Sequence, residues 1–400
     1  MRSRGERSWP LVVALLPAIL ALSIGCSSTD EPGAVEQGRA SSESTRTSGT
    51  AAETATADRP PDEPGTYGVG RTTVTLVDKE RSGRTLTTDV WYPIVAAPEA
   101  PPSLYQFDAA IPAIDLEVAK ADQPIAPGGP FPLIVFSHGS PSIRYQSLFF
   151  TELLASHGFV VAAPDHAGDS AVDALRGSLA AASTVSIDRP ADISFVIDAV
   201  LGGAVDEPAG LADAVDADRI GIVGHSGGGD TVLAVTGGRS GVAADDRVKA
   251  VLAWTPSTAG LTDESLSAID RPTMLVGATL DDIAPIEPNV ERAWAAISGR
   301  PLYRVDITGG GHDQFTNVCD FLAAADANPD FPAALRPVVD LPAADACTPD
   351  FIPIEDAHRI ISRFGVAFLE RHVAGDVDAA TWLTSATAAK MPEVTLTAKE

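Results

Sequence analysis

A serine bounded by glycines stands where a predicted buried strand meets a helix near the middle of the chain. The apolar run 219–223 precedes the pentapeptide Gly-His-Ser-Gly-Gly at 224–228, and a Gly-rich helix start continues to residue 235. In this context G-x-S-x-G predicts a sharp turn that strains the serine backbone and lifts its hydroxyl above the sheet edge. Ser226 is therefore our candidate nucleophile. The alternative is that Ser226 only caps the helix.

A serine hydroxyl is a poor nucleophile unless a base takes its proton and a carboxylate orients that base. We assign the base to His312, because it lies in a glycine-rich loop directly after the predicted strand 303–307. Open α/β sheets place reactive groups in such loops. The other histidines lie inside the turn, on helical patterns or in other loops: His138, His157, His166, His225, His358 and His372.

Two adjacent aspartates are candidates for the orienting acid. Asp281 and Asp282 follow the predicted strand 272–277, and both precede His312, as the order serine, acid, histidine requires. We prefer Asp281, because Asp282 can instead cap the turn before Pro285. Spacing alone leaves both open.

Acyl transfer also needs N–H donors directed at the developing oxyanion. The Gly227 N–H follows the nucleophile, and the loop after the predicted strand 131–136 supplies a second donor. We assign this donor to the Ser140 N–H, since Pro141 has none. This chemistry requires no metal and no organic cofactor.

The N-terminus predicts export. Three arginines (Arg2, Arg4 and Arg7) precede an apolar run at 11–24 that ends just before Cys26. The run is shorter than the roughly 20 apolar residues of a transmembrane helix. The pattern resembles a bacterial lipoprotein signal with Cys26 as the lipidated residue, which implies membrane contact through a lipid anchor. An ordinary secretory peptide is the alternative.

Composition divides the rest of the chain. Residues 27–65 are rich in Ser, Thr, Ala, Glu and Pro, which predicts a disordered linker. We expect one folded domain over 66–385, with an insertion at about 313–353 and a C-terminal tail at 386–400. If Cys26 is lipidated, Cys319 and Cys347 remain as a pair, which favours a disulfide in an oxidising compartment over a metal site.

Charge excludes one class of partner. The net charge of −26 argues against binding to nucleic acid, whose phosphates would be repelled. The sequence does not indicate how many copies of the chain associate.

Periodicity indicates an α/β fold. The segments 71–77 and 85–92 alternate at period two, which predicts an antiparallel hairpin. Strands and helices then alternate, and one helix is expected at 191–201 behind the start signal of Asp188 and Pro190. This alternation predicts a mostly parallel central sheet with helices on both faces. The segment 313–353 is long enough to form a partial lid or acyl-binding wall, although a surface excursion explains it equally well.

Residues 67–372 resemble the α/β-hydrolase fold. Ser-His-Gly-Ser at 137–140, the pentapeptide at 224–228 and His-Asp-Gln-Phe at 312–315 are similar to the platelet-activating-factor acetylhydrolase branch. The segment 281–285 is more similar to cutinase-like polyester hydrolases, and 154–161 resembles both. The resemblance implies a serine esterase or lipase that acts through an acyl-enzyme on a small-molecule or lipid ester.

One position departs from the acetylhydrolases. They take their acid from just after the strand that follows the elbow helix, where this chain has Leu252, and this leaves Asp281 as the acid. Trp254 is expected either to line the acyl pocket or to pack at the strand end. Two alternatives to an esterase stay open: a serine hydrolase that cleaves amides, and a non-catalytic surface lipoprotein that uses the fold for binding.

Overall fold

The computed structural model describes residues 59–106 and 118–400. The predicted export signal, Cys26 and the linker up to residue 58 lie outside them. Part of the expected linker contacts the domain, because Asp62 pairs with Arg363 at 2.7 Å and the Gly65 N–H donates to Ser156 Oγ at 2.8 Å. The packed chain therefore begins before the predicted boundary at residue 66.

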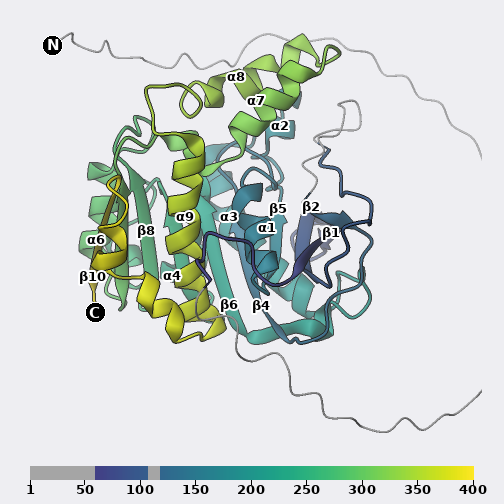
Figure 1. The fold of residues 1–400 in the computed structure, drawn as a ribbon, viewed down its shortest axis with the longest axis horizontal. Helices are drawn as coiled ribbons and strands as arrows, with labels where there is room; N and C mark the ends of the chain where they lie inside the picture. The colour runs from purple at the N-terminus through teal and green to yellow at the C-terminus, as the bar shows by residue number, and fades with distance from the viewer. Residues whose placement is uncertain (1–58, 107–117) are drawn as a thin grey trace, which may run out of the picture. The chain divides into compact units, whose positions relative to one another are not determined.

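Ten strands of the described residues form one sheet (Figure 1). From edge to edge they are β10 (Val394–Lys399), β9 (Leu302–Ile307), β8 (Thr273–Ala278), β7 (Val248–Trp254), β6 (Val215–His225), β4 (Phe131–Ser137), β5 (Val160–Pro164), β2 (Arg84–Ile94), β1 (Gly68–Asp78) and β3 (Lys120–Ala121). The central run from β9 to β5 is parallel, and β1 and β2 form the predicted antiparallel hairpin. The mostly parallel sheet is confirmed.

Helices cover both faces of this sheet. They are α1 (Leu148–Ser156), α2 (Ala171–Arg176), α3 (Ala182–Leu201), α4 (Gly227–Gly237), α5 (Asp263–Ser267), α6 (Arg292–Ala296), α7 (Val318–Ala327), α8 (Arg336–Ala343), α9 (Ile354–Leu369) and α10 (Ser385–Ala388). One apolar core holds α1 and α9 against the sheet, and a second holds α3 to α6 on the other side. Figure 1 shows α9 in front of the strands. β4 is buried along its whole length, as expected for a strand covered on both faces.

Helix α3 begins at Ala182, earlier than the predicted start behind Pro190. A proline inside a helix has no N–H for the carbonyl four residues before it. Here that carbonyl belongs to Ser186, and it accepts a hydrogen bond from Arg239 Nη1 at 3.0 Å. A long-range contact thus satisfies the group that Pro190 leaves free, and local sequence gave no sign of it.

Residues 386–400, which we predicted as a tail, contribute an edge strand instead. β10 pairs antiparallel with β9, from Val394 opposite Ile307 to Lys399 opposite Leu302. A single short strand is stable only through such pairing, so its sequence alone does not distinguish it from a tail.

The segment 313–353 is largely helical and contains α7 and α8, which lie side by side in Figure 1. A disulfide joins Cys319 to Cys347, as the sequence predicted. Within residues 59–106 and 118–400, no helix is both long and apolar enough to cross a membrane.

Candidate active site

Ser226 lies in a strained turn between β6 and α4. Its φ of 57° and ψ of −117° fall in a region that non-glycine residues rarely adopt, and such a conformation costs about 1–3 kcal/mol. The neighbouring glycines are required by space, because a Cβ on Gly224 would lie 2.1 Å from the Gly228 carbonyl oxygen. A Cβ on Gly228 would lie 1.9 Å from the Ser137 carbonyl oxygen. The turn therefore has the geometry expected of a nucleophile elbow.

The structure brings Ser226, His312 and Asp281 together in one hydrogen-bonded row. His312 Nε2 lies 2.9 Å from Ser226 Oγ, and His312 Nδ1 lies 2.7 Å from Asp281 Oδ2. Asp281 follows β8, and His312 follows the adjacent parallel strand β9, so sheet topology places both at the same edge. Both are at most 4% exposed, whereas Ser226 is half-buried. Such a row can pass the hydroxyl proton to the imidazole.

Asp281, and not Asp282, faces the histidine. The second carboxylate oxygen of Asp281, Oδ1, accepts the backbone N–H groups of Ile283 at 2.9 Å and Ala284 at 2.7 Å. Asp281 therefore caps its own turn and contacts the imidazole at the same time. Asp282 is exposed.

Three carboxyl groups act on the imidazole of His312. Burial lowers the pKa of His312, but the hydrogen bond and charge of Asp281, followed by the charges of Asp313 and Asp345, leave it above its ordinary value of 6.5. The backbone N–H of His312 donates to Asp345 Oδ2 at 2.8 Å. Burial, opposed by the charge of His312, raises the pKa of Asp313 to about 7.

The two predicted oxyanion donors are neighbours. β4 pairs directly with β6, so the loop after Ser137 runs beside the serine turn. A Cβ on Gly227 would lie 2.7 Å from Ser140 Cβ and 3.4 Å from the Ser140 backbone nitrogen. The two amides therefore lie close together, beside Ser226.

A family comparison supports this reading of the fold. A model of the family described as PET hydrolase-like matches residues 122–325, about half of the chain. The chain belongs to this PET hydrolase-like family. The matched range includes Ser226, Asp281 and His312, and it ends before Cys347, α9 and β10.

Curated relatives lie in the two branches that the sequence motifs resemble. The chain is 27% identical over 165 residues to cutinase est1 of Thermobifida alba, which covers 41% of this chain and 47% of the cutinase. It is 26% identical over 226 residues to the platelet-activating factor acetylhydrolase of Cavia porcellus, covering 45% and 49%. Cutinase 2 of Thermobifida cellulosilytica is 25% identical over 154 residues, covering 38% and 49%. The chain spans about half the length of these relatives.

Trp254 of this PET hydrolase-like chain lies in the core. It is fully buried, and its ring packs among Phe136, Phe150 and Phe315. Its position is that of the packing alternative rather than of a pocket-lining residue.

Sequence reasoning did not find several residues that support the row. His225 Nε2 lies 2.9 Å from the His312 carbonyl oxygen, and its Nδ1 lies 3.1 Å from Gln146 Nε2. Asp345 reaches His312 from the segment that follows α8. Sequence spacing gives no signal for these contacts, since the chain between the partners folds back over several elements.

Proposed function

We propose that the protein is a serine carboxylic-ester hydrolase that acts through an acyl-enzyme. The observation that carries the proposal is the row in which His312 Nε2 is 2.9 Å from Ser226 Oγ and Nδ1 is 2.7 Å from Asp281. Membership of the PET hydrolase-like family and the names of the cutinase and acetylhydrolase relatives support it.

The proposed first half-reaction forms the acyl-enzyme. His312 Nε2 takes the proton of Ser226 Oγ as Oγ bonds to the ester carbonyl carbon, and the carbonyl oxygen becomes an oxyanion. The N–H groups of Ser140 and Gly227 stabilise that charge. The imidazolium then gives its proton to the leaving alcohol as the carbon–oxygen bond breaks, and Asp281 stabilises the imidazolium meanwhile.

Water completes the cycle. His312 takes a proton from a water molecule whose oxygen attacks the acyl carbon, and a second tetrahedral adduct forms in the same oxyanion site. Its collapse breaks the bond to Oγ, the imidazolium returns a proton to Ser226, and the carboxylic acid leaves. No step requires a group beyond this chain and water.

Turnover of p-nitrophenyl butyrate and labelling by a fluorophosphonate test the proposal. We expect the wild-type protein to hydrolyse the ester and to carry the phosphonate on Ser226 by peptide mass spectrometry. Ser226→Ala should remove both while the circular dichroism spectrum is unchanged. Turnover that survives Ser226→Ala would contradict the assignment, and folded wild-type protein that is neither labelled nor active would favour a binding function. Comparison with p-nitroanilide substrates separates ester from amide cleavage.

The substrate class within esters is an extension of this proposal. The relatives are named as cutinases and as platelet-activating factor acetylhydrolases, which implies either polyesters or phospholipid-like acetyl esters. A panel of p-nitrophenyl esters from acetate to palmitate, with polyester film and a short-chain phospholipid, tests both.

We also propose that the protein is exported and that Cys26 is lipidated. The disulfide between Cys319 and Cys347 supports export, because disulfides persist in oxidising compartments. Lipidation at Cys26 rests on the sequence pattern alone. Metabolic labelling with an alkyne fatty acid should mark the wild-type protein and not a Cys26→Ala variant.

A further inference from the structure

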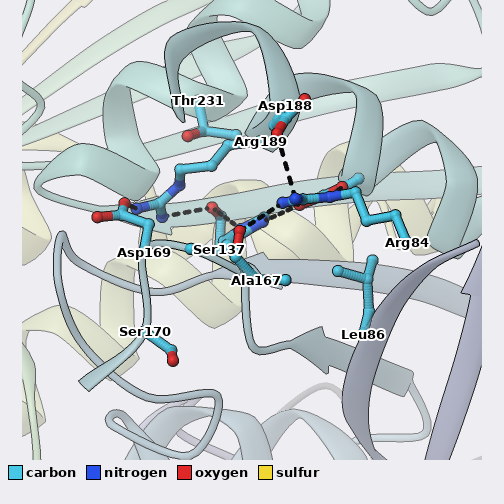
Figure 2. A network of polar contacts seen from close by, with 12 residues as sticks. Arg84, Leu86, Ser137, Ala167, Asp169, Ser170, Asp188, Arg189 and Thr231 are labelled. Atoms are coloured by element: carbon cyan, nitrogen blue, oxygen red, sulfur yellow. Dashed lines mark hydrogen bonds and ion pairs between the residues drawn. The ribbon is translucent and has the colours of Figure 1, made fainter. Parts of the chain in front are cut away.

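Arg189 of α3 lies buried beneath the loop that follows β4. Its side chain is 3% exposed, and Figure 2 shows its guanidinium group between Asp169 and Ser137. Nη1 donates to Asp169 Oδ2 at 2.6 Å and to the Gly139 carbonyl oxygen at 3.3 Å. Nη2 donates to Ser137 Oγ at 3.1 Å and to the His138 carbonyl oxygen. One side chain thus holds three consecutive residues, the last of β4 and the first two of the loop.

One of these contacts fixes the direction of the Ser140 N–H. The Gly139 carbonyl and the Ser140 N–H belong to the same peptide group, and in a trans peptide they point in opposite directions. This peptide bond is not among the cis bonds of the chain. Arg189 Nη1 and His138 Nδ1, at 3.3 and 2.6 Å, both hold the Gly139 carbonyl oxygen. The N–H is therefore held facing away from the buried guanidinium.

Asp169 holds the side chain of Ser140. Its Oδ1 accepts the Ser140 hydroxyl at 2.9 Å, while its Oδ2 receives Arg189. Arg189 also adjoins the second proposed donor, because a Cβ on Gly227 would lie 3.4 Å from its Nη1. Arg189 and Asp169 thus contact the residues around both proposed donors, the Ser140 and Gly227 amides.

A fully buried hydrogen-bonded row fixes the start of the loop. Ser137 Oγ lies 3.0 Å from His166 Nε2, and His166 Nδ1 lies 2.9 Å from Asp192 Oδ2. These residues repeat the Ser–His–Asp pattern, but all three are 0% exposed. Since the Ser137 hydroxyl also accepts a hydrogen bond from Arg189, this row anchors β4 rather than meeting a substrate.

We propose that Arg189 and Asp169 are positioning residues that hold the Ser140 amide in the oxyanion site, an inference that rests on the proposed esterase function. A buried ion pair is by itself weak evidence for stability, since well-packed apolar residues often replace one without loss. A role in orienting one peptide group explains why a single guanidinium makes four donor contacts, to Asp169 and to residues 137–139.

Arg189→Lys tests the proposal, with Arg71→Lys as a matched control. Lysine keeps the charge but cannot make the forked contacts. Arg71 is also a buried arginine, paired with Asp89 at 2.8 Å and bonded to the Leu104 carbonyl oxygen, on the distant strand β1. We expect Arg189→Lys to lower kcat for p-nitrophenyl butyrate about 10- to 100-fold, approaching the loss of an oxyanion donor. KM should change less than about twofold, since the ground-state ester does not use the donor fully.

A tetrahedral-adduct inhibitor gives a readout that a structural role alone would not move. Butylboronic acid bonds to the nucleophilic serine and places an oxygen in the oxyanion site, so its Ki should rise with the loss in kcat in Arg189→Lys. Arg71→Lys should lower the melting temperature without changing kcat or Ki.

Ser140→Ala covers the case in which Arg189→Lys does not fold. Ser140 is exposed, and the variant keeps its amide while losing only the bond to Asp169. We expect kcat to fall about threefold to tenfold, as for one lost hydrogen bond, and butylboronic acid to bind correspondingly more weakly. The inference is overturned if Ser140→Ala and Arg189→Lys leave both quantities unchanged, or if Arg189→Lys behaves as Arg71→Lys does. An inactive, unlabelled wild-type protein would instead overturn the proposed function.

Discussion

Asp281 is held by its own loop at the same time as it contacts His312. One carboxylate oxygen lies 2.7 Å from His312 Nδ1, and the other accepts the N–H groups of Ile283 and Ala284. The turn therefore holds the carboxylate in place independently of the histidine. The contact with Asp281 favours the tautomer that carries its hydrogen on Nδ1, and this leaves Nε2 free to accept the proton of Ser226.

Separate replacement of the adjacent aspartates distinguishes their roles. We expect Asp281→Asn to lower kcat about 10³- to 10⁴-fold, since the amide cannot stabilise the imidazolium and favours the wrong tautomer. Asp282→Asn should stay within about threefold of the wild type, because this exposed carboxylate makes no comparable contact. Steady-state kinetics with p-nitrophenyl butyrate measure both. A larger loss in Asp282→Asn would refute the assignment of the acid.

The pH profile should report the carboxylates around His312. Activity requires a neutral imidazole, and the raised pKa of His312 places the acid limb of kcat/KM above pH 6.5. Asp345→Asn removes a negative charge that raises this pKa but retains an acceptor for the His312 N–H. The limb should therefore shift to lower pH. Asp340→Asn, at an exposed site on α8, is the control and should leave the profile in place. An upward shift in Asp345→Asn would contradict this account.

The sequence predicted the parts of the site that depend on local pattern. The glycine-bounded serine after a buried run, and the aspartate and histidine after later runs, each carry their signal within a few residues of a strand end. Parallel neighbours then bring those ends together, which is why Ser226, Asp281 and His312 were accessible to sequence reasoning.

The parts that sequence reasoning missed depend on distant partners. The early start of α3 requires Arg239 to satisfy the Ser186 carbonyl, and β10 exists only through pairing with β9. Arg189 sits in a helix whose pattern gives no reason to connect it with residues 137–139. Such contacts depend on how distant segments pack, and the spacing of residues along the sequence does not predict them.

The elbow glycines should tolerate no side chain. A Cβ on Gly228 would lie 1.9 Å from the Ser137 carbonyl oxygen, so Gly228→Ala must displace either β4 or the serine turn. We expect the free energy of unfolding to fall by about 3 kcal/mol or more, with loss of turnover in any folded fraction. Gly241→Ala is the control, because open space surrounds that position and only its φ of 87° opposes alanine, at about 1 kcal/mol. Urea unfolding curves that match for the two variants would contradict the steric argument.

The disulfide should stabilise the α7–α8 segment and, through it, the surroundings of His312. Cys319 and Cys347 are 28 residues apart, and closure of a loop of that length contributes about 2–4 kcal/mol in the chain-entropy account. Asp345 lies two residues before Cys347 and accepts the His312 N–H. We therefore expect a Cys319→Ser/Cys347→Ser variant to exchange amide hydrogens faster in α7 and α8 and to lose several-fold in kcat.

Reduction provides the control for that variant. A phosphine reductant should bring the wild-type protein to the exchange rates and kcat of the double variant, and should not change the double variant further. If the reduced wild-type protein keeps both full protection in α7 and α8 and full kcat, the segment is held by its apolar contacts and by the Asp345 bond to His312. The disulfide would then contribute to neither local order nor activity.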